Sequence, residues 1–322
     1  MNICNVCPNS CNLDNQTICG EKPEFDSLEY VEATAVAIDP IEKKPLYHFL
    51  PGTETLSIGT KNCNIKCLFC QNHSIAQPSK DSDVYFKRYT PEELVDFALE
   101  KNLPSISWTY NEPTIHYKWI IQTAEIAREE GIKTVLVTNG YNTPELINKL
   151  SKYVDAVNVD IKSIENQFYR EVCYAQIDPV LNSVETYYKN GVHIEITNLL
   201  IPGYNDSLST IRGLVDYLKR LSDKIPLHFS AFYPQYKMMD VEPTSPKIID
   251  KACDLAKYMG LKYVYPGNVP SSYKDNTICK HCRQPLIKRV GYQVETYITN
   301  QNACSHCNHK ADVITFKSFD GV

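Results

Sequence analysis

From about residue 53 to residue 266, the sequence alternates short runs of β-branched and aromatic residues with longer segments of helical character. Parallel strands need long connections, so alternation at this spacing predicts right-handed crossovers and a parallel sheet. We therefore expect an α/β fold, a partial (βα)6 TIM-like barrel with one extra strand. The expected strands are 53–58, 105–110, 133–138, 154–160, 193–200, 226–232 and 261–265.

Several of the intervening helices have readable starts. Thr90 is followed by a proline and then by Glu93, which together predict an N-cap and a capping box. Ser245, also followed by proline, gives a similar signal. Asn205 is expected to cap a helix over 206–221.

The chain has 13 cysteines, and eleven of them fall into three sets. Its net charge of −5 predicts no general attraction to nucleic acid or to anionic membranes. Because neither a signal peptide nor an apolar run of roughly 18–20 residues is evident, we expect a cytoplasmic protein with reduced thiols. Metal ligation therefore explains the sets better than disulfides do. The sets are Cys4, Cys7, Cys11 and Cys19; Cys63, Cys67 and Cys70; and Cys279, Cys282, Cys304 and Cys307.

The central set is written CNIKCLFC. Three thiolates can hold three corners of a cubic iron–sulfur cluster and leave the fourth iron without a protein ligand, whereas electron-transfer clusters normally have four cysteines. An open iron is a Lewis acid that can hold a substrate or a cofactor. A zinc knuckle or a chance arrangement is the alternative. The two cysteines outside the sets, Cys173 and Cys253, are expected to be buried packing residues in helices.

The CxxxCxxC spacing resembles the signature of the radical S-adenosylmethionine (SAM) superfamily. This resemblance implies a [4Fe-4S] cluster on Cys63, Cys67 and Cys70 whose open iron chelates the amino and carboxylate groups of SAM. It also implies that an aromatic residue, here Phe69, packs against the adenine. Polar residues follow the expected strands at their carboxyl ends, where barrels of parallel strands collect functional groups. A chance distribution of polar loops explains one or two of these ends, but not their succession after the motif.

Within the superfamily, the chain resembles the activating enzymes typified by the pyruvate formate-lyase activating enzyme. Asn111 and Glu112 stand where that branch has Gly-Glu, which implies that Glu112 accepts the SAM ammonium in a charge-assisted hydrogen bond. Thr138 and Asn139 match a stretch in which the family has an aspartate that helps to bind a monovalent cation. That aspartate is Val137 here, so the chain departs from the family's cation site.

Further SAM contacts are implied by the same resemblance. Asp160 and Lys162 match a DxK motif whose lysine contacts the SAM carboxylate; a solvated lysine is the alternative. His228 matches a histidine that reaches the ribose, and a satisfied core histidine is the alternative. Asn198 and the loop 201–203 are expected to line the ribose and methionine side.

Over nearly its full length the chain is similar to the radical SAM group called AmmeMemoRadiSam. That group is named for genes found beside a Memo-like and an AMMECR-like protein, so the resemblance suggests both as partners. The shared features include CNIKCLFCQN, IPGYND, PLHFSAFYPQYKM and the cysteine sets at both ends. The group's name indicates gene neighbours and no reaction.

The C-terminal set consists of two CxxC pairs separated by 21 residues, which resembles a zinc ribbon. A closed tetrathiolate has no position for a substrate, so the expected role is to fold a small module over 271–322 with a hairpin at Gly291. Iron bound in rubredoxin style is the alternative. The glycine that usually follows each pair is Arg283 and Asn308 here.

Residues 1–50 do not follow the strand–helix rhythm, and their four cysteines leave several interpretations open. The spacing CxxCxxxC followed by a fourth cysteine is compatible with an auxiliary iron–sulfur cluster or with a zinc ion. It is equally compatible with a mixed metal site completed by residues from elsewhere in the chain, or with no metal. Free thiols near a terminus oxidise readily, which favours a metal. The expected domains are 1–50, the barrel over 51–270 and the ribbon over 271–322.

These patterns predict a radical SAM enzyme. A low-potential reductant such as ferredoxin or flavodoxin would reduce the cluster, which would then cleave SAM to methionine and a 5′-deoxyadenosyl radical that abstracts hydrogen from a substrate. The substrate is expected to be a small molecule or a protein, and activation of a glycyl-radical enzyme is the alternative. An electron-transfer protein is a third interpretation, but it leaves the SAM-contact residues without a role.

Overall fold

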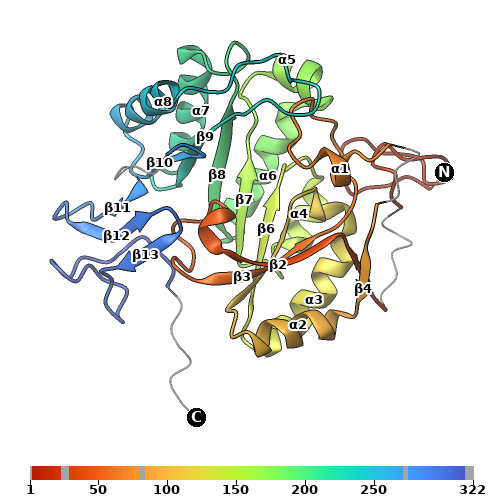
Figure 1. Cartoon of the computed structure of the whole chain (residues 1–322), viewed down its shortest axis with the longest axis horizontal. Coiled ribbons are helices and arrows are strands. Elements are labelled where there is room, and N and C mark those ends of the chain that lie inside the picture. The colour runs from red at the N-terminus through yellow and green to blue at the C-terminus, as the bar shows by residue number, and fades with distance from the viewer. Residues whose placement is uncertain (1, 23–28, 80–83, 271–274, 316–322) are drawn as a thin grey trace.

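A computed structural model describes residues 2–22, 29–79, 84–270 and 275–315 (Figure 1). Its main feature is an eight-stranded sheet in the order β10-β9-β8-β7-β6-β5-β3-β2. All of these strands run parallel except β2, which pairs antiparallel with β3. The strands are β2 (Ala35–Pro40), β3 (Glu54–Gly59), β5 (Ser105–Thr109), β6 (Lys133–Thr138), β7 (Ala156–Asp160), β8 (His193–Leu200), β9 (Leu227–Ala231) and β10 (Val264–Gly267).

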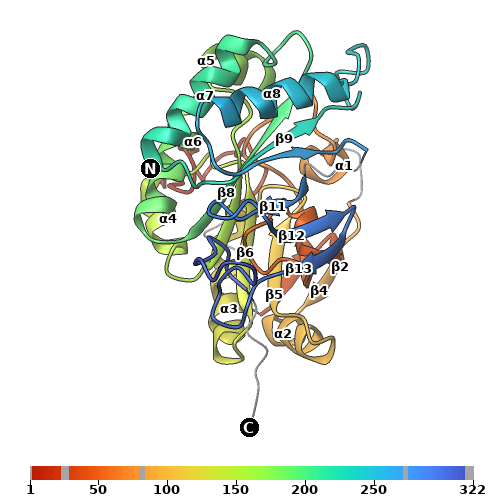
Figure 2. The same cartoon turned by 90° about the vertical axis from the view of Figure 1, so that its left-hand side faces the viewer.

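The predicted partial barrel is confirmed, because every expected strand is present and helices connect the parallel strands. In the described residues the edge strands β2 and β10 do not pair with each other, so the barrel is open. Helices cover its outer face (Figures 1 and 2). They are α1 (His73–Ala76), α2 (Pro91–Glu100), α3 (Tyr117–Glu129), α4 (Pro144–Leu150), α5 (Asn166–Phe168), α6 (Ile177–Lys189), α7 (Leu208–Leu221) and α8 (Pro246–Tyr258), with the 3₁₀ turns η2 (Ile41–Lys43) and η3 (Pro113–His116) and the π-helical turn η4 (Tyr169–Cys173).

The helix starts were predicted with one error. The capping box at α2 is confirmed: the Thr90 hydroxyl accepts from the Glu93 N–H at 3.1 Å, and the Glu93 carboxylate accepts from the Thr90 N–H at 2.8 Å. The predicted cap of α7 is wrong, because Ser207 holds that position and accepts from the Thr210 N–H. Asn205 instead braces the preceding loop, where its side chain accepts from the Ile201 N–H at 2.6 Å.

Two apolar clusters of the barrel determine at which end of the sheet a site can form. The larger cluster packs the helices against the outer face of the sheet. The smaller one places Phe49 and its neighbours against Val135 and Ala156 of β6 and β7. Because Val135 and Ala156 lie toward the amino ends of their strands, the segment that contains Phe49 fills this end of the barrel and leaves the carboxyl ends for function.

The two terminal regions lie on opposite sides of the barrel (Figure 1). The N-terminal segment 2–22 lies against the start of α4, where the Thr143 N–H donates to the Val6 carbonyl at 3.1 Å. The short strand β1 (Val31–Ala33) pairs with β4 (Lys87–Tyr89). The C-terminal module forms a separate sheet of β11 (Thr277–Ile278), β12 (Pro285–Val290) and β13 (Gln293–Thr296) (Figure 2). The predicted hairpin is confirmed, since β12 and β13 pair antiparallel around Gly291. The predicted boundary at residue 50 stays a prediction, and β2 lies within that extension.

Candidate active site

The cysteines of the CxxxCxxC motif lie in the loop that leaves the carboxyl end of β3. Asn111, at the end of β5, fixes the start of this loop. Its side-chain amide donates to the carbonyls of Lys61 and Asn62 at 3.0 and 2.9 Å, and its side-chain oxygen accepts from the Thr60 N–H at 3.1 Å. The loop therefore has a defined entry from the sheet.

A fourth cysteine lies against the middle of the loop. The carbonyl of Cys173, in η4, accepts from the Lys66 N–H at 2.9 Å. A hydrogen bond between the Cys173 and Cys67 thiols, together with burial, raises the pKa of Cys67 well above its usual value. Cys173 is buried, as predicted, but its contact with Cys67 was not predicted, because a helical pattern does not show which loop the residue faces.

Asn139, which follows β6, donates to the motif itself. Its side-chain amide lies 3.5 Å from the Cys63 sulfur and 2.8 Å from the side-chain oxygen of Asn64. Burial raises the pKa of both Cys63 and Cys70. The thiols are therefore protonated until a metal displaces their protons, and the Asn139 amide is placed to stabilise a sulfur that carries negative charge.

Glu112 is buried, and its carboxylate joins the turn at Thr114 to the loop at Thr138 and Asn139. Its carboxylate accepts from the Thr114 N–H and hydroxyl at 3.2 and 2.6 Å, from the Thr138 hydroxyl at 2.8 Å and from the Asn139 N–H at 2.7 Å. Burial raises its pKa against these bonds. Three of the four bonds end on Oε1 and one on Oε2, so Oε2 has the capacity for a further donor.

A half-buried cation lies on the other side of the cysteines. The Lys162 ammonium pairs with Asp160 at 2.8 Å and lies 5.9 Å from the centre of the Phe69 ring. Burial lowers the pKa of Lys162, but the charge of Asp160 and its hydrogen bond outweigh this effect and raise the pKa above its ordinary value. Lys162 therefore keeps its charge beside the motif, unlike a solvated lysine. The Asn198 side-chain amide fixes the backbone of Lys162 by donating to its carbonyl at 3.2 Å.

His228 occupies a different environment. Its Nε2 lies 2.7 Å from Glu195, which also accepts from the backbone N–H groups of Tyr47 and His48 at 3.0 and 2.7 Å. Burial raises the pKa of Glu195, but hydrogen bonds from His193 and His228 outweigh it and hold the pKa well below its usual range. This is the arrangement expected of a satisfied core histidine. The contact of His228 with a ribose stays a prediction.

Comparison with known proteins agrees with this geometry. The profile described as Radical SAM superfamily matches residues 57–218, from β3 to α7. The chain belongs to the radical SAM superfamily. An uncharacterized protein of Methanocaldococcus jannaschii is 39% identical over 325 residues, covering 97% of this chain and 95% of its own.

Other relatives are named as activating enzymes. The choline trimethylamine-lyase activating enzyme of Oleidesulfovibrio alaskensis is 25% identical over 70% of this chain and 71% of its own. The pyruvate formate-lyase-activating enzyme of Clostridium pasteurianum is 24% identical over 65% of this chain and 91% of its own. A solved radical SAM methyltransferase from Sphaerobacter thermophilus shares the fold, with a TM-score of 0.54 at 16% identity over 69% of this chain and 68% of that one.

The predictions of a radical SAM enzyme and of similarity to activating enzymes are thus confirmed. The family implies a [4Fe-4S] cluster and SAM, and the three thiols beside a charged lysine fit both groups. The assignment to the AmmeMemoRadiSam group stays a prediction. None of the helices in the described parts of the chain combines the length and apolarity needed to cross a bilayer.

The C-terminal cysteines of this radical SAM protein form a compact group that could hold a metal ion. All four sulfurs lie within 4.8 Å of one another, and the pairs Cys279–Cys307 and Cys282–Cys304 are each 3.7 Å apart. Tetrahedral zinc with bonds of about 2.3 Å holds its sulfurs about 3.8 Å apart. The cluster of thiols therefore fits a single ion, and zinc remains our prediction for it.

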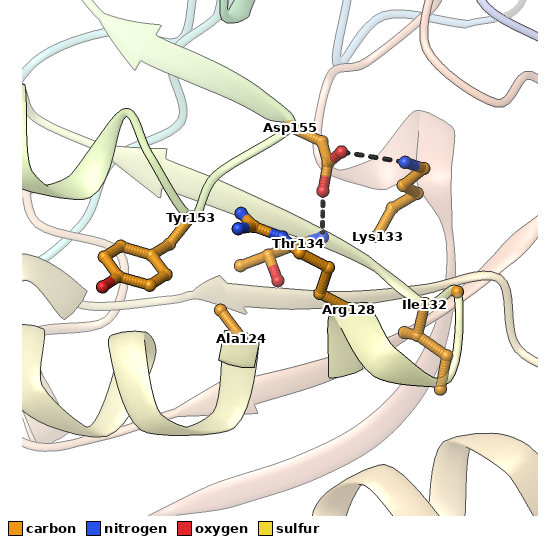
Figure 3. A pocket seen from close by; sticks show the side chains of 8 residues that line it. Ala124, Arg128, Ile132, Lys133, Thr134, Tyr153 and Asp155 are labelled. Atoms are coloured by element: carbon orange, nitrogen blue, oxygen red, sulfur yellow. Dashed lines mark hydrogen bonds and ion pairs between the residues drawn. The ribbon is translucent and has the colours of Figure 1, made fainter. Parts of the chain in front are cut away.

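A small surface pocket at the other end of the sheet is not part of this site. It lies at the amino ends of β6 and β7, where Asp155 accepts from the Lys133 ammonium at 3.0 Å and from the Thr134 N–H at 2.9 Å (Figure 3). Its Arg128 guanidinium donates to the Lys152 carbonyl, and the pocket lies on the face away from the cysteine motif.

Proposed function

We propose that the protein cleaves SAM reductively at a cluster held by Cys63, Cys67 and Cys70 and uses the resulting radical to take hydrogen from a substrate. The observation that carries this proposal is the placement of the three thiols between a charged Lys162 and the Asn139–Glu112 network. When bound, the cluster supplies the electron that breaks the sulfonium bond.

The chain's own residues would bind and orient SAM. Lys162 keeps a positive charge in a half-buried position and suits the SAM carboxylate. Glu112 is a buried carboxylate on the Cys63 side, and its Oε2 can accept from the SAM ammonium. Phe69 lies beside Lys162 and offers a ring for the adenine. Asn198 contributes by fixing the backbone of Lys162.

The substrate class remains a proposal. Several relatives are named as activating enzymes of glycyl-radical enzymes, which favours a protein substrate as a second candidate. The flanking cysteine modules favour a dedicated modification of a small molecule or of another protein. The proposed electron donor is ferredoxin or flavodoxin, and the Memo-like and AMMECR-like proteins are the first candidates to test as partners.

Anaerobic reconstitution with iron and sulfide tests the proposal. The native protein, reduced with dithionite, should convert SAM to 5′-deoxyadenosine and methionine, and the Cys63/Cys67/Cys70→Ala variant should not. Retained zinc and an unchanged melting temperature would show that the variant is folded. A reduced SAM-site cluster that yields no 5′-deoxyadenosine would refute the proposed reaction.

A further inference from the structure

The N-terminal segment 2–22 is docked on the loop that carries the CxxxCxxC motif. The Asn9 side chain donates to the carbonyl of Asn64, the residue after Cys63, at 2.8 Å. Thr143, which follows β6 and caps α4, donates its hydroxyl to the Asn5 carbonyl at 2.6 Å. The segment therefore lies at the carboxyl end of the sheet, on the same face as the candidate active site.

The four cysteines form the interior of this segment. An antiparallel bridge between Ile3 and Asn12 brings Cys4 beside Cys11, whose carbonyl accepts from the Cys4 N–H at 2.8 Å. Cys4, Cys7 and Cys19 are buried and Cys11 is half-buried.

Little else holds this segment together. It contains no helix or ladder strand among the described residues. Val6 and Leu13 are buried, but Ile3 and Ile18 are 46% and 52% exposed. Val6 and Leu13 both belong to the large apolar cluster of the barrel, so the segment has no separate core of its own. Small cysteine-rich units of this kind usually depend on a metal.

The sulfurs also receive hydrogen bonds of the kind that stabilise metal-bound thiolates. The Ile18 N–H donates to the Cys11 sulfur at 3.5 Å. The Asn9 N–H bonds the Cys7 sulfur and lowers its pKa against the effect of burial. Such donors are a recognised means of tuning iron–sulfur clusters.

The spacing of the sulfurs separates this set from the ribbon. Among the described residues, only the ribbon thiols form a group within 4.8 Å of one another, the size of a single-ion site. The N-terminal four do not form such a compact group, although every one of them is described. A four-iron cluster holds its cysteine sulfurs farther apart than one ion does, because each sulfur binds a different iron.

We propose that Cys4, Cys7, Cys11 and Cys19 hold a second iron–sulfur cluster that passes electrons to the site on Cys63, Cys67 and Cys70. One electron from a flavodoxin- or ferredoxin-type carrier reduces the N-terminal cluster. That electron then moves to the second site, which returns the N-terminal cluster to its oxidised state. The Asn9–Asn64 hydrogen bond links the two sets, because Asn9 lies two residues from Cys7 and Asn64 lies next to Cys63. This inference rests on the proposed function, which supplies the acceptor.

Iron content and electron paramagnetic resonance of the full-length chain test the site itself. The native protein should hold about eight irons, and the Cys7→Ala/Cys11→Ala and Cys63/Cys67/Cys70→Ala variants about four each. SAM should alter the reduced signal that remains in the first variant and leave that of the second unchanged. Native protein with about four irons, or with zinc on the N-terminal set, would overturn the proposal, whether or not SAM is cleaved.

Asn9→Ala tests the relay without removing a ligand. Both clusters should load fully, while reduction of the SAM-responsive cluster by reduced flavodoxin should slow at least severalfold and the dithionite end point should not change. The matched control is Asn12→Ala, which removes a hydrogen bond from the Asp14 N–H within the same segment (3.0 Å). An unchanged rate in Asn9→Ala would refute the path. If SAM is never cleaved but both clusters load, the proposed function fails while the second site stands.

Discussion

Both ends of the chain carry four cysteines, yet the fold places them on opposite faces of the barrel. The N-terminal set lies against the loops at the carboxyl ends of β3 and β6. The ribbon lies at the amino ends, where Asp312 pairs with Lys224 before β9 and accepts from the Tyr263 hydroxyl before β10. In barrels of parallel strands the carboxyl face carries the chemistry and the opposite face supports stability. The position of each set therefore indicates its role better than its ligands do.

The ribbon is joined to the barrel by buried polar contacts. Arg289 is fully buried; it donates to the Tyr47 carbonyl at 2.7 Å and lies 3.7 Å from Glu42. His48 contacts the Asp312 carbonyl at 2.6 Å and the Tyr265 hydroxyl at 2.7 Å. The ribbon thus closes the end of the barrel that the segment containing Phe49 fills, and loss of its metal should weaken the whole fold.

Removal of a ribbon ligand should have the largest effect on stability. Cys304→Ser should lose the zinc and lower the melting temperature strongly, since structural zinc contributes about 10–16 kcal/mol in isolated zinc-finger peptides. Elemental analysis and thermal unfolding measure both effects. Cys253→Ala, a buried cysteine in α8, is the control and should keep its zinc. Full zinc occupancy in Cys304→Ser would rule out the proposed ligand set.

On the opposite face, Glu112→Gln should weaken SAM binding and leave the ribbon untouched. Loss of a charge-assisted hydrogen bond costs about 1.5–3 kcal/mol, which corresponds to roughly a tenfold to hundredfold rise in the dissociation constant. Equilibrium binding to the reconstituted protein measures it, with iron content and melting temperature as checks. Unchanged affinity would assign the ammonium contact to another residue and leave Glu112 the role of organising the loops of Thr114 and Asn139.

The interface of the ribbon should also depend on pH through His48. Burial lowers the pKa of this histidine to about 4 from its usual 6.5. Between these values the unfolded chain binds a proton that the folded chain does not, so stability falls with falling pH by up to about 1.4 kcal/mol per unit. His48→Gln should show a shallower decline between pH 7.5 and 5.5 in denaturant unfolding. The exposed His306→Gln serves as control, and equal slopes in His48→Gln and native protein would contradict the assignment.

The smallest expected effect concerns the turns of the ribbon. Arg283 and Asn308 both adopt the left-handed conformation, with φ of 63° and 59°. Arginine there costs about 1–2 kcal/mol relative to glycine, whereas asparagine tolerates it better. Arg283→Gly should therefore raise the unfolding free energy by up to about 1 kcal/mol, and Asn308→Gly by less. A larger gain at Asn308 would contradict this ranking.

The sequence predicted what local patterns encode. Strand positions, the capping box at Thr90 and the hairpin at Gly291 all follow from neighbouring residues. The contacts of Cys173 with Cys67 and of His48 with Asp312 join segments more than a hundred residues apart, and no periodicity reports such pairs. The error at Asn205 also comes from a contact that the local pattern does not report. The Asn205 side chain accepts from the Ile201 N–H, and Ser207, two residues later, caps α7 instead.

The central claim is that the two faces have separate roles, and turnover per cluster tests it most directly. Anaerobically reconstituted native protein, Cys304→Ser and Cys67→Ala should be reduced with dithionite and supplied with SAM, with 5′-deoxyadenosine normalised to the SAM-responsive cluster. We predict that Cys304→Ser, despite its lower stability, forms as much product per cluster as the native protein does, and that Cys67→Ala, which loses a ligand of that cluster, forms no product per protein chain. A collapse of turnover in Cys304→Ser while its barrel and cluster remain intact would contradict the account, because the ribbon would then belong to the active site.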